Sequence, residues 1–164
     1  DPLTGLMNRR GLNAALGAAL ANCDASRRVA VLMLDLDGFK PVNDQHGHDA
    51  GDELLASIAG RLRAAVRATD TIARVGGDEF VVVAPGLPDI ARAEELAAKL
   101  LALFAEPIVL PSRDGAVCAV GVTIGVAVAP DDGVNAPDLL RAADQAMYRG
   151  KENGKGRVMR FAVS

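Results

Sequence analysis

Aromatic residues, cysteine and positive charge are all in short supply in this sequence. Aromatics make up 3% of the chain and tryptophan is absent, so the core must be built from Ala, Val, Leu and Ile. With a formal net charge of −3, the chain lacks the basic excess and the stacking side chains of nucleic-acid binders, and we expect no nucleic-acid partner. The two cysteines, Cys23 and Cys118, fit no Cys-x-x-Cys spacing, which favours two reduced thiols over a zinc site or a disulfide.

The sequence also lacks a signal peptide and any apolar run long enough to span a membrane. We therefore expect a cytoplasmic domain, although its parent protein can still be attached to a membrane. Half of the 164 residues are hydrophobic, which suits one domain spanning residues 1–164 with a core of its own. Because the chain opens on Asp1 rather than Met, we expect it to be excised from a longer multidomain signalling protein.

Hydrophobic periodicity predicts an alternation of helices and strands. The predicted helices cover residues 8–21, 49–68, 88–106 and 135–148, and the predicted strands cover residues 29–36, 71–75, 80–83, 117–128 and 157–161. Without the first helix, this order contains a β-α-β-β-α-β core, the ferredoxin-like arrangement, in which helices cover one face of a sheet that contains antiparallel strands. The predicted fold class is therefore α+β, with a central sheet flanked by helices.

The run RVGGDEF, residues 74–80, is the most informative segment of the chain. Gly76 and Gly77 permit a tight turn with close backbone approach to a ligand, and they lead directly into Asp78 and Glu79. Two adjacent carboxylates repel each other unless a cation lies between them, and a hard divalent cation bound to phosphate suits this role. A bare hairpin tip is the alternative explanation, since Gly-Gly-Asp turns are common on protein surfaces.

Two further carboxylates, Asp35 and Asp37, end a predicted buried strand. Strand alternation sends both to one face and Leu36 to the other. A buried carboxylate is costly unless it is paired or bound to a metal, and in the predicted fold this strand lies beside the Gly-Gly hairpin. Asp35 can then face Asp78 and Glu79, which would create a two-metal centre for phosphoryl transfer. For Asp37 alone, we favour a capping role at the following turn.

Polar groups suited to a nucleotide follow these carboxylates. Backbone N–H groups in the turn at 38–40 can cradle phosphates, and Lys40 adds a cation nearby. Asn43 offers a donor and an acceptor, and Asp52 can accept from two adjacent N–H groups, which guanine presents and adenine does not. The i, i+2 histidine pair lacks a third ligand, so zinc is disfavoured and we expect a hydrogen-bonded structural role for His48.

Two charged clusters remain. Arg67 and Asp70 lie at the end of a predicted helix, where an arginine complements the helix dipole, but the pair can equally form an anion site that reads a base edge. Lys151, Lys155 and Arg157 follow the last predicted helix. Such a run is usually a solvated helix end, but it can neutralise a triphosphate if it folds back over the hairpin.

Together these motifs resemble the GGDEF domain family, the diguanylate cyclases, over essentially the whole chain. The matching segments are Asp1-x-Leu3-Thr4-Gly5-Leu6-x-Asn8-Arg9-Arg10, Asp35-x-Asp37-x-Phe39-Lys40-x-x-Asn43-Asp44, Gly47-His48-x-x-Gly51-Asp52, Arg74-x-Gly76-Gly77-Asp78-Glu79-Phe80, Thr123-Ile124-Gly125-Val126-Ala127 and Ala143-Asp144-x-Ala146-Met147-Tyr148. One such motif is weak evidence, whereas the full set in register is highly specific.

The resemblance implies a fold like the nucleotidyl cyclase palm and the condensation of two GTP into cyclic di-GMP and two pyrophosphates. It implies that Asp35, the carbonyl of Leu36 and Asp78 hold Mg²⁺ or Mn²⁺. Glu79 either joins the metal site or helps to deprotonate the attacking 3′-OH. The catalytic residues are thus expected to be Asp35, Asp78 and Glu79.

The resemblance also implies the binding residues. Asn43 and Asp52 would read guanine. The remaining substrate-binding residues, expected around the phosphates, are Phe39, Lys40, Gly76, Gly77, Lys151 and Lys155. The Arg67-x-x-Asp70 motif matches the inhibitory product site of the family, for which Lys99 is an additional candidate cation.

One GTP per domain implies a homodimer of half-sites. An upstream sensor is expected in the parent chain, and residues 157–161 resemble the junction before a downstream EAL phosphodiesterase domain. Two departures from the family are Lys155, where Arg is frequent, and Gly156, where Asn is usual. A non-catalytic domain that binds GTP or cyclic di-GMP is the alternative, but the complete set of carboxylates favours the enzyme. An adenylyl cyclase or polymerase palm is disfavoured by Asn43 with Asp52.

Overall fold

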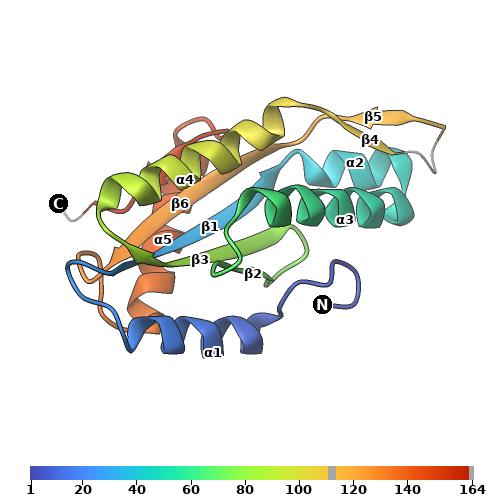
Figure 1. Ribbon diagram of the computed structural model, residues 1–164. Coiled ribbons are helices and arrows are strands. Elements are labelled where there is room, and N and C mark those ends of the chain that lie inside the picture. The colour runs from blue at the N-terminus through green and yellow to red at the C-terminus, as the bar shows by residue number, and fades with distance from the viewer. Residues whose placement is uncertain (111–113, 163–164) are drawn as a thin grey trace.

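Apolar strands form a central sheet that is covered on both faces in the computed structural model, which describes residues 1–110 and 114–162 (Figure 1). The elements are α1 (Arg9–Leu20), β1 (Arg28–Asp37), α2 (Phe39–His46), α3 (His48–Ala65), β2 (Thr71–Arg74), β3 (Glu79–Leu87), α4 (Ile90–Ala102), the 3-10 helix η1 (Leu103–Ala105), β4 (Ile108–Leu110), β5 (Ala116–Cys118), β6 (Gly121–Ala129), α5 (Ala136–Glu152) and β7 (Val158–Arg160). No helix in these described ranges is long and apolar enough to cross a membrane.

The main sheet has the strand order β2-β3-β1-β6-β7. Its central strand, β1, pairs antiparallel with both β3 and β6, while β7 runs parallel to β6 at the far edge. Strands β1, β2, β3 and β6, with helices α3 and α4, form the expected β-α-β-β-α-β core. The predicted α+β fold class is therefore confirmed.

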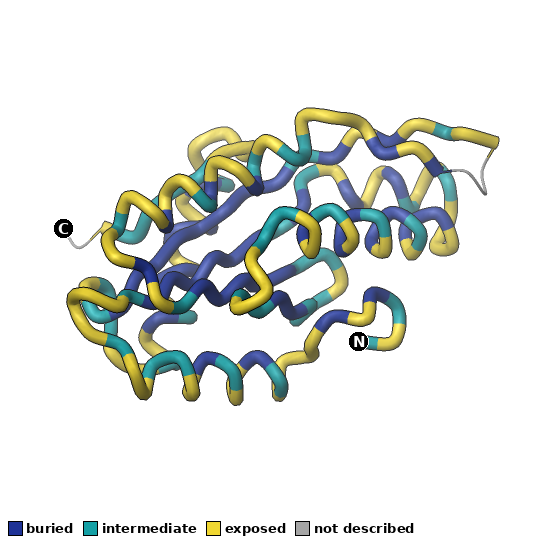
Figure 2. Tube along the Cα trace, viewed as in Figure 1, coloured by how far each residue is buried: buried dark blue, intermediate teal, exposed yellow. Residues whose placement is uncertain are grey.

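The two faces of the sheet bury separate clusters of side chains, as strand alternation requires. Leu32 and Leu34 of β1 pack toward α3 and α4, whereas Val31 and Met33 pack toward α1 and α5. Figure 2 shows the resulting pattern, with buried strands between helices whose outer sides are exposed. The expectation that helices cover one face holds for the ferredoxin-like core, but α1 and α5 also cover the other face.

Helix α5 approaches β6 unusually closely. A Cβ built on Gly125 of β6 would lie 2.1 Å from the carbonyl oxygen of Ala143 and 2.4 Å from the amide nitrogen of Met147. Only glycine fits here, because any side chain would collide with the backbone of α5. At the end of α5, a Cβ on Gly150 would lie 2.7 Å from Cγ2 of Thr123. This close packing brings the residues after Gly150 next to the end of β1.

Two sequence-based predictions of secondary structure were wrong. The segment 39–46 is a helix, α2, where we expected only a turn at 38–40 and no helix. Its short, polar sequence hides the signal, because only Phe39 and Val42 are buried. The predicted strand 117–128 is also divided, since β5 leaves the main sheet to pair with β4 before β6 begins. Both cysteines are free thiols, as expected.

Candidate functional site

The carboxylates predicted to act together meet at one end of the β1–β3 pair. Asp35 lies directly opposite Glu79 in the antiparallel register, so their side chains share the face that α5 covers. The amide of Leu36 donates to the carbonyl of Asp78 at 3.2 Å, which holds the end of β1 against the hairpin. Asp78 itself lines a pocket on the α2–α3 side. The Gly-Gly turn thus places its two carboxylates toward different sides of the sheet.

Asp35 is the least satisfied of these groups. Its Oδ1 atom is buried and finds no hydrogen-bond donor among the described residues. Burial, together with the negative charges of Asp78 and Glu79, raises the pKa of Asp35 to about 6, against the lowering effect of Lys151. Asp35 is therefore a carboxylate that a further cation would stabilise.

Lys151 of α5 reaches Asp35 from the face of the sheet that α5 covers. Its ammonium pairs with Oδ1 of Asp37 and lies 3.4 Å from Oδ2 of Asp35. It also lies 3.4 Å from the carbonyl oxygens of Asp35 and Leu36. The ammonium therefore contacts two of the atoms that the family resemblance connected with the metal, a carboxylate oxygen of Asp35 and the carbonyl oxygen of Leu36.

Asp37 has a different role from the turn cap that we favoured. Its carboxylate accepts from Oγ1 of the buried Thr123 at 2.9 Å and from the amide of Gly156 at 2.9 Å, in addition to Lys151. These contacts join the end of β1 to the segment after α5. The sequence placed Asp37 correctly, but only the packing of α5 on the sheet reveals its partners.

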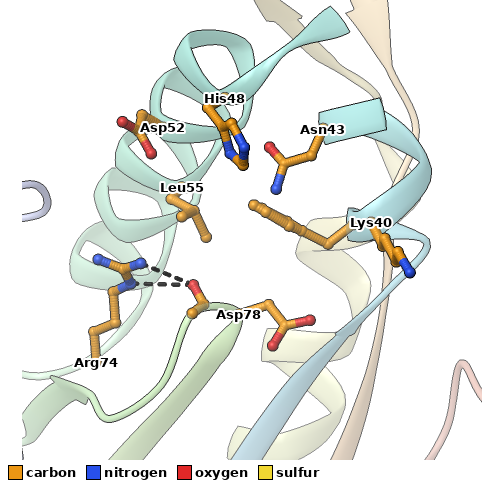
Figure 3. Close-up of a pocket in the computed structure, with 9 residues that line it drawn as sticks. Lys40, Asn43, His48, Asp52, Leu55, Arg74 and Asp78 are labelled. Carbon is orange, nitrogen blue, oxygen red and sulfur yellow. Dashed lines mark hydrogen bonds between the residues drawn. The ribbon is translucent and has the colours of Figure 1, made fainter. Parts of the chain in front are cut away.

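A pocket of about 280 Å³ opens beside the carboxylates, between α2, α3 and the Gly-Gly turn (Figure 3). Its lining residues are Phe39, Lys40, Asn43, His48, Asp52, Leu55, Arg74, Gly77 and Asp78. The predicted guanine readers, Asn43 and Asp52, therefore face the same cavity from two helices. The predicted phosphate residues Gly76, Lys151 and Lys155 are not among its lining residues.

Asn43 is held in an unusual setting. Its Oδ1 atom is buried and has no hydrogen-bond partner among the described residues. A Cβ on Gly51 of α3 would lie 1.7 Å from this atom, so the side chain occupies space that only a glycine leaves open. A buried amide oxygen without a donor is costly, and a ligand that donates an N–H would satisfy it. Gly51 is thus a supporting residue that sequence analysis missed, although it stands in a quoted motif.

Two lining residues have functions that the sequence did not indicate. Arg74 donates from Nε and Nη2 to the carbonyl of Gly77 at 3.2 and 3.0 Å, the dashed lines of Figure 3, and pairs with Asp1 at 3.3 Å. Arg74 therefore connects the Gly-Gly turn with the first residue of the chain through a hydrogen-bonded carbonyl and an ion pair. His48, for which we expected a structural hydrogen bond, is exposed and points toward Asn43 across the mouth of the pocket (Figure 3).

The expected phosphate contacts lie around the start of α2 and the end of α5. Gly38, with φ 82°, precedes α2, whose first N–H groups have no side-chain cap and suit an anion. Lys40 in the first turn is exposed. Beyond α5, Lys155 and Gly156 both have left-handed backbone, with φ of 61° and 59°. Glycine and asparagine both tolerate this conformation, which explains why Gly156 can stand where the family usually has Asn.

The predicted inhibitory pair is assembled at a separate place. Arg67 pairs with Asp70 at 2.7 Å and donates to the carbonyl of Pro85 at 2.8 Å. The Asp70 side chain is 1% exposed and that of Arg67 is 50% exposed. Lys99 of α4 lines the same cavity of about 290 Å³ and donates to the carbonyl of Ala65 at 2.7 Å. The three residues that we associated with a product site are therefore neighbours.

The donor set fits a hard divalent cation in part. Within residues 1–110 and 114–162, no three His, Cys, Asp or Glu side chains are already arranged as a metal site. The unsatisfied Oδ1 of Asp35, the Leu36 carbonyl and the nearby Asp78 are nevertheless oxygen ligands of the kind that Mg²⁺ prefers. The residues present therefore fit the predicted metal if the ammonium of Lys151 moves away from the oxygen atoms of Asp35 and Leu36.

Comparison with known proteins agrees with this geometry. Residues 1–157 match the family described as "Diguanylate cyclase, GGDEF domain". The chain belongs to the GGDEF family. This GGDEF domain is 44% identical over 165 residues to the bifunctional diguanylate cyclase/cyclic di-GMP phosphodiesterase MucR of Pseudomonas aeruginosa, covering 100% of this chain and 24% of MucR. The chain spans a quarter or less of the length of the curated relatives that it matches first.

Solved structures support the same assignment. The GGDEF domain of TpbB from Pseudomonas aeruginosa superposes with a TM-score of 0.93 at 37% identity, covering 98% of this chain and 99% of that chain. The GGDEF domain of DgcB from Caulobacter crescentus, in complex with cyclic di-GMP, superposes with a TM-score of 0.83 at 27% identity, covering 98% and 94%. Homologous domains therefore share this fold, and at least one binds cyclic di-GMP.

Proposed function

We propose that this GGDEF domain is a diguanylate cyclase, which condenses two GTP molecules into cyclic di-GMP and releases two pyrophosphates. The proposal depends on one observation: two features of the structure lie side by side. A pocket with an unsatisfied Asn43 oxygen and the Asp52 carboxylate adjoins the Asp35, Asp78 and Glu79 carboxylates. The first feature suits a guanine base, and the second suits phosphoryl transfer.

Different residues bind the guanine base and the phosphates of the substrate. Asp52 accepts from guanine N1–H and the exocyclic amine, while Asn43 accepts from the amine or donates to a ring acceptor. The uncapped N-terminus of α2 binds phosphate oxygens through backbone N–H groups. Lys40, Lys151 and Lys155 add positive charge along the phosphates, and the Gly76-Gly77 turn lets the backbone approach them.

In the proposed reaction, Asp35, the Leu36 carbonyl and Asp78 would hold Mg²⁺ or Mn²⁺. When bound, the cation lowers the pKa of the attacking hydroxyl and neutralises charge on the α-phosphate. Glu79 accepts the proton of the 3′-OH of one GTP. The freed oxygen bonds to the α-phosphorus of the GTP in the opposing half-site, and the bond from that phosphorus to the pyrophosphate oxygen breaks. A second, reciprocal step closes the ring.

We propose that Arg67 and Asp70, with Lys99, bind cyclic di-GMP as an inhibitor. Their shared cavity and the half-exposed guanidinium support this role. Arg67→Ala should leave the initial rate of GTP turnover close to that of the wild type and raise the product concentration needed for half-inhibition by at least about tenfold. Steady-state rates at increasing added cyclic di-GMP measure this, and unchanged inhibition would contradict the assignment.

The proposal is tested by GTP turnover with Mg²⁺ or Mn²⁺ at high protein concentration, with nucleotide products separated by chromatography and ATP as the control substrate. Cyclic di-GMP should form from GTP alone. Asp78→Ala and Glu79→Ala should each reduce the rate by at least about a hundredfold. Wild-type rates in the Glu79 variant would refute the assigned mechanism.

The alternative is a non-catalytic domain that binds GTP or cyclic di-GMP and regulates a neighbour. By analogy with the bifunctional name of MucR, such a neighbour would be an EAL phosphodiesterase domain in the parent chain, under an upstream sensor. GTP binding without cyclic di-GMP formation, even after forced dimerisation through a fused coiled coil, would favour this alternative.

A further inference from the structure

Lys151 lies where a divalent cation is expected, and this position carries an inference that rests on the proposed function. Its ammonium is surrounded by oxygen atoms from Asp35, Leu36 and Asp37. Two belong to carboxylates and two to backbone carbonyls, an all-oxygen environment of the kind that hard divalent cations occupy. The side chain of Lys151 is only 20% exposed, so the ammonium is held within the site rather than in solvent.

The ammonium satisfies this environment unevenly. An ammonium has three N–H donors, and four oxygen acceptors surround this one. Its contact with Asp37 is tight, whereas the contacts with Asp35 and Leu36 are 3.4 Å long, beyond the usual 2.7–3.2 Å of an N–H···O hydrogen bond. The buried Oδ1 of Asp35 remains without a donor. The half of the site that belongs to Asp35 and Leu36 is therefore only loosely occupied.

Asp37 can keep its ion pair with Lys151 after the ammonium has left Asp35 and Leu36. Its carboxylate is fixed by Thr123 and by the amide of Gly156, independently of Lys151. Losing the 3.4 Å contacts would leave the Lys151–Asp37 pair intact. The two carboxylates therefore have different roles. Asp35 can exchange the ammonium of Lys151 for a metal ion, whereas Asp37 stays bound to Thr123 and to the segment after α5.

We propose that Lys151 is a stand-in cation, which neutralises Asp35 and the Leu36 carbonyl before the metal binds and is displaced from them when it does. Without metal, the ammonium prevents the carboxylates from repelling one another. A divalent cation at Asp35 and Leu36 repels the ammonium, which stays within reach of Asp37 and becomes free to meet a phosphate. Metal and nucleotide binding are coupled through this one side chain.

The first test measures Mn²⁺ binding by calorimetry without nucleotide, in wild type, Lys151→Met and Arg149→Met. Lys151→Met removes the competing charge at nearly constant volume, so its affinity for Mn²⁺ should rise by at least about tenfold. Arg149→Met is the matched control, because it removes a positive charge from an exposed position of the same helix, outside the site. Its affinity should stay within about twofold of wild type. An unchanged or weaker affinity in Lys151→Met overturns the inference.

A second test uses the wild-type domain, so it does not depend on whether a variant folds. Lysine reductive methylation of the wild-type domain, mapped by mass spectrometry, should proceed several-fold faster at Lys151 when Mg²⁺ is added, because the ammonium loses its contacts. Lys99, which donates to Ala65 in another part of the fold, is the internal control and should not change. Equal labelling of Lys151 with and without saturating Mg²⁺ overturns the inference.

The outcomes separate this inference from the proposed function. If the domain makes cyclic di-GMP but Lys151→Met binds Mn²⁺ no more tightly, only the stand-in role fails. If the affinity rises and Lys151 becomes reactive but no cyclic di-GMP forms, only the proposed catalytic function fails.

Discussion

At the scale of single residues, the site is defined by polar atoms that the fold leaves unsatisfied. Asp35 Oδ1 and Asn43 Oδ1 are both buried without a donor among the described residues. Each such atom destabilises the folded chain, because its hydration is lost without a replacement. One atom belongs to the pocket between α2 and α3 and the other to the carboxylates beside it, so both are places where a ligand would supply the missing partner.

The charge of Asp35 should therefore destabilise the metal-free domain at neutral pH. Its folded pKa of about 6 lies above the ordinary value of 3.8, so folding favours the protonated carboxyl, and this contribution is full below about pH 4 and lost as the pH rises through 6. Asp35→Asn should be more stable than wild type by about 1–2 kcal/mol at pH 7.5 in chelator, after allowance for solvent screening.

Chemical denaturation at several pH values measures this difference. The advantage of Asp35→Asn should shrink toward pH 4, and saturating Mg²⁺ should stabilise the wild type but not the variant. Asp37→Asn is the matched comparison: it should lose stability at pH 7.5, because its carboxylate accepts from Thr123, Gly156 and Lys151. A pH-independent difference between Asp35→Asn and wild type would contradict the account.

Gly51 should control the guanine pocket through Asn43. In Gly51→Ala the new methyl group would lie 1.7 Å from Asn43 Oδ1 and 3.3 Å from Cζ of Phe39, so the amide must leave its position. GTP affinity, measured by calorimetry, should fall by at least about tenfold. Gly60→Ala is the control on the same helix, with nothing within 4 Å of its Cβ, and should keep wild-type affinity. Equal affinities of the two variants would exclude this role of Gly51.

At the scale of elements, the contact between α5 and β6 decides whether the two halves of the site meet. Lys151 follows Gly150 within the last turn of α5, and Asp37 pairs with Gly121 at the start of β6. Their ion pair requires that helix and strand pack without intervening side chains. The close approach at Gly125 and Gly150 provides this.

Gly125→Ala should therefore damage both stability and the site. Its Cβ meets backbone atoms of α5 at 2.1 and 2.4 Å, which cannot move independently of the helix. The free energy of unfolding, measured with urea, should fall by about 3 kcal/mol or more. Gly17→Ala in α1, where the space around the Cβ is open, should instead be neutral or slightly stabilising. A stable Gly125→Ala domain would show that α5 can shift without cost.

At the scale of the whole molecule, one chain offers a single Asn43–Asp52 pair and one Asp78–Glu79 pair. Joining two GTP molecules needs each nucleotide to be presented to the other, so a monomer should be a half-site. Specific activity should rise with protein concentration at saturating GTP and level off once the dimer dominates. Turnover from nanomolar to high micromolar protein tests this, and a constant specific activity would contradict a dimer of half-sites.

The sequence by itself determined the α+β class, the burial of β1 and the place of Asp35 beside the Gly-Gly turn, opposite Glu79. These follow from local apolar patterns and from the alternation of strands, which act over a few residues. The same patterns failed for α2, whose buried face is only Phe39 and Val42, and for residues 117–128, where pairing with β4 breaks an otherwise uniform run.

Only the tertiary structure decided what the individual side chains do. Asp37 lies 114 residues from Lys151 and 119 residues from Gly156 in the chain, and no local pattern specifies contacts between residues so far apart. Asn43 depends on the missing side chain of Gly51, and Arg74 on the position of Asp1. Contacts of this kind arise when whole helices dock on the sheet, because close packing, rather than propensity, then selects which polar groups are satisfied.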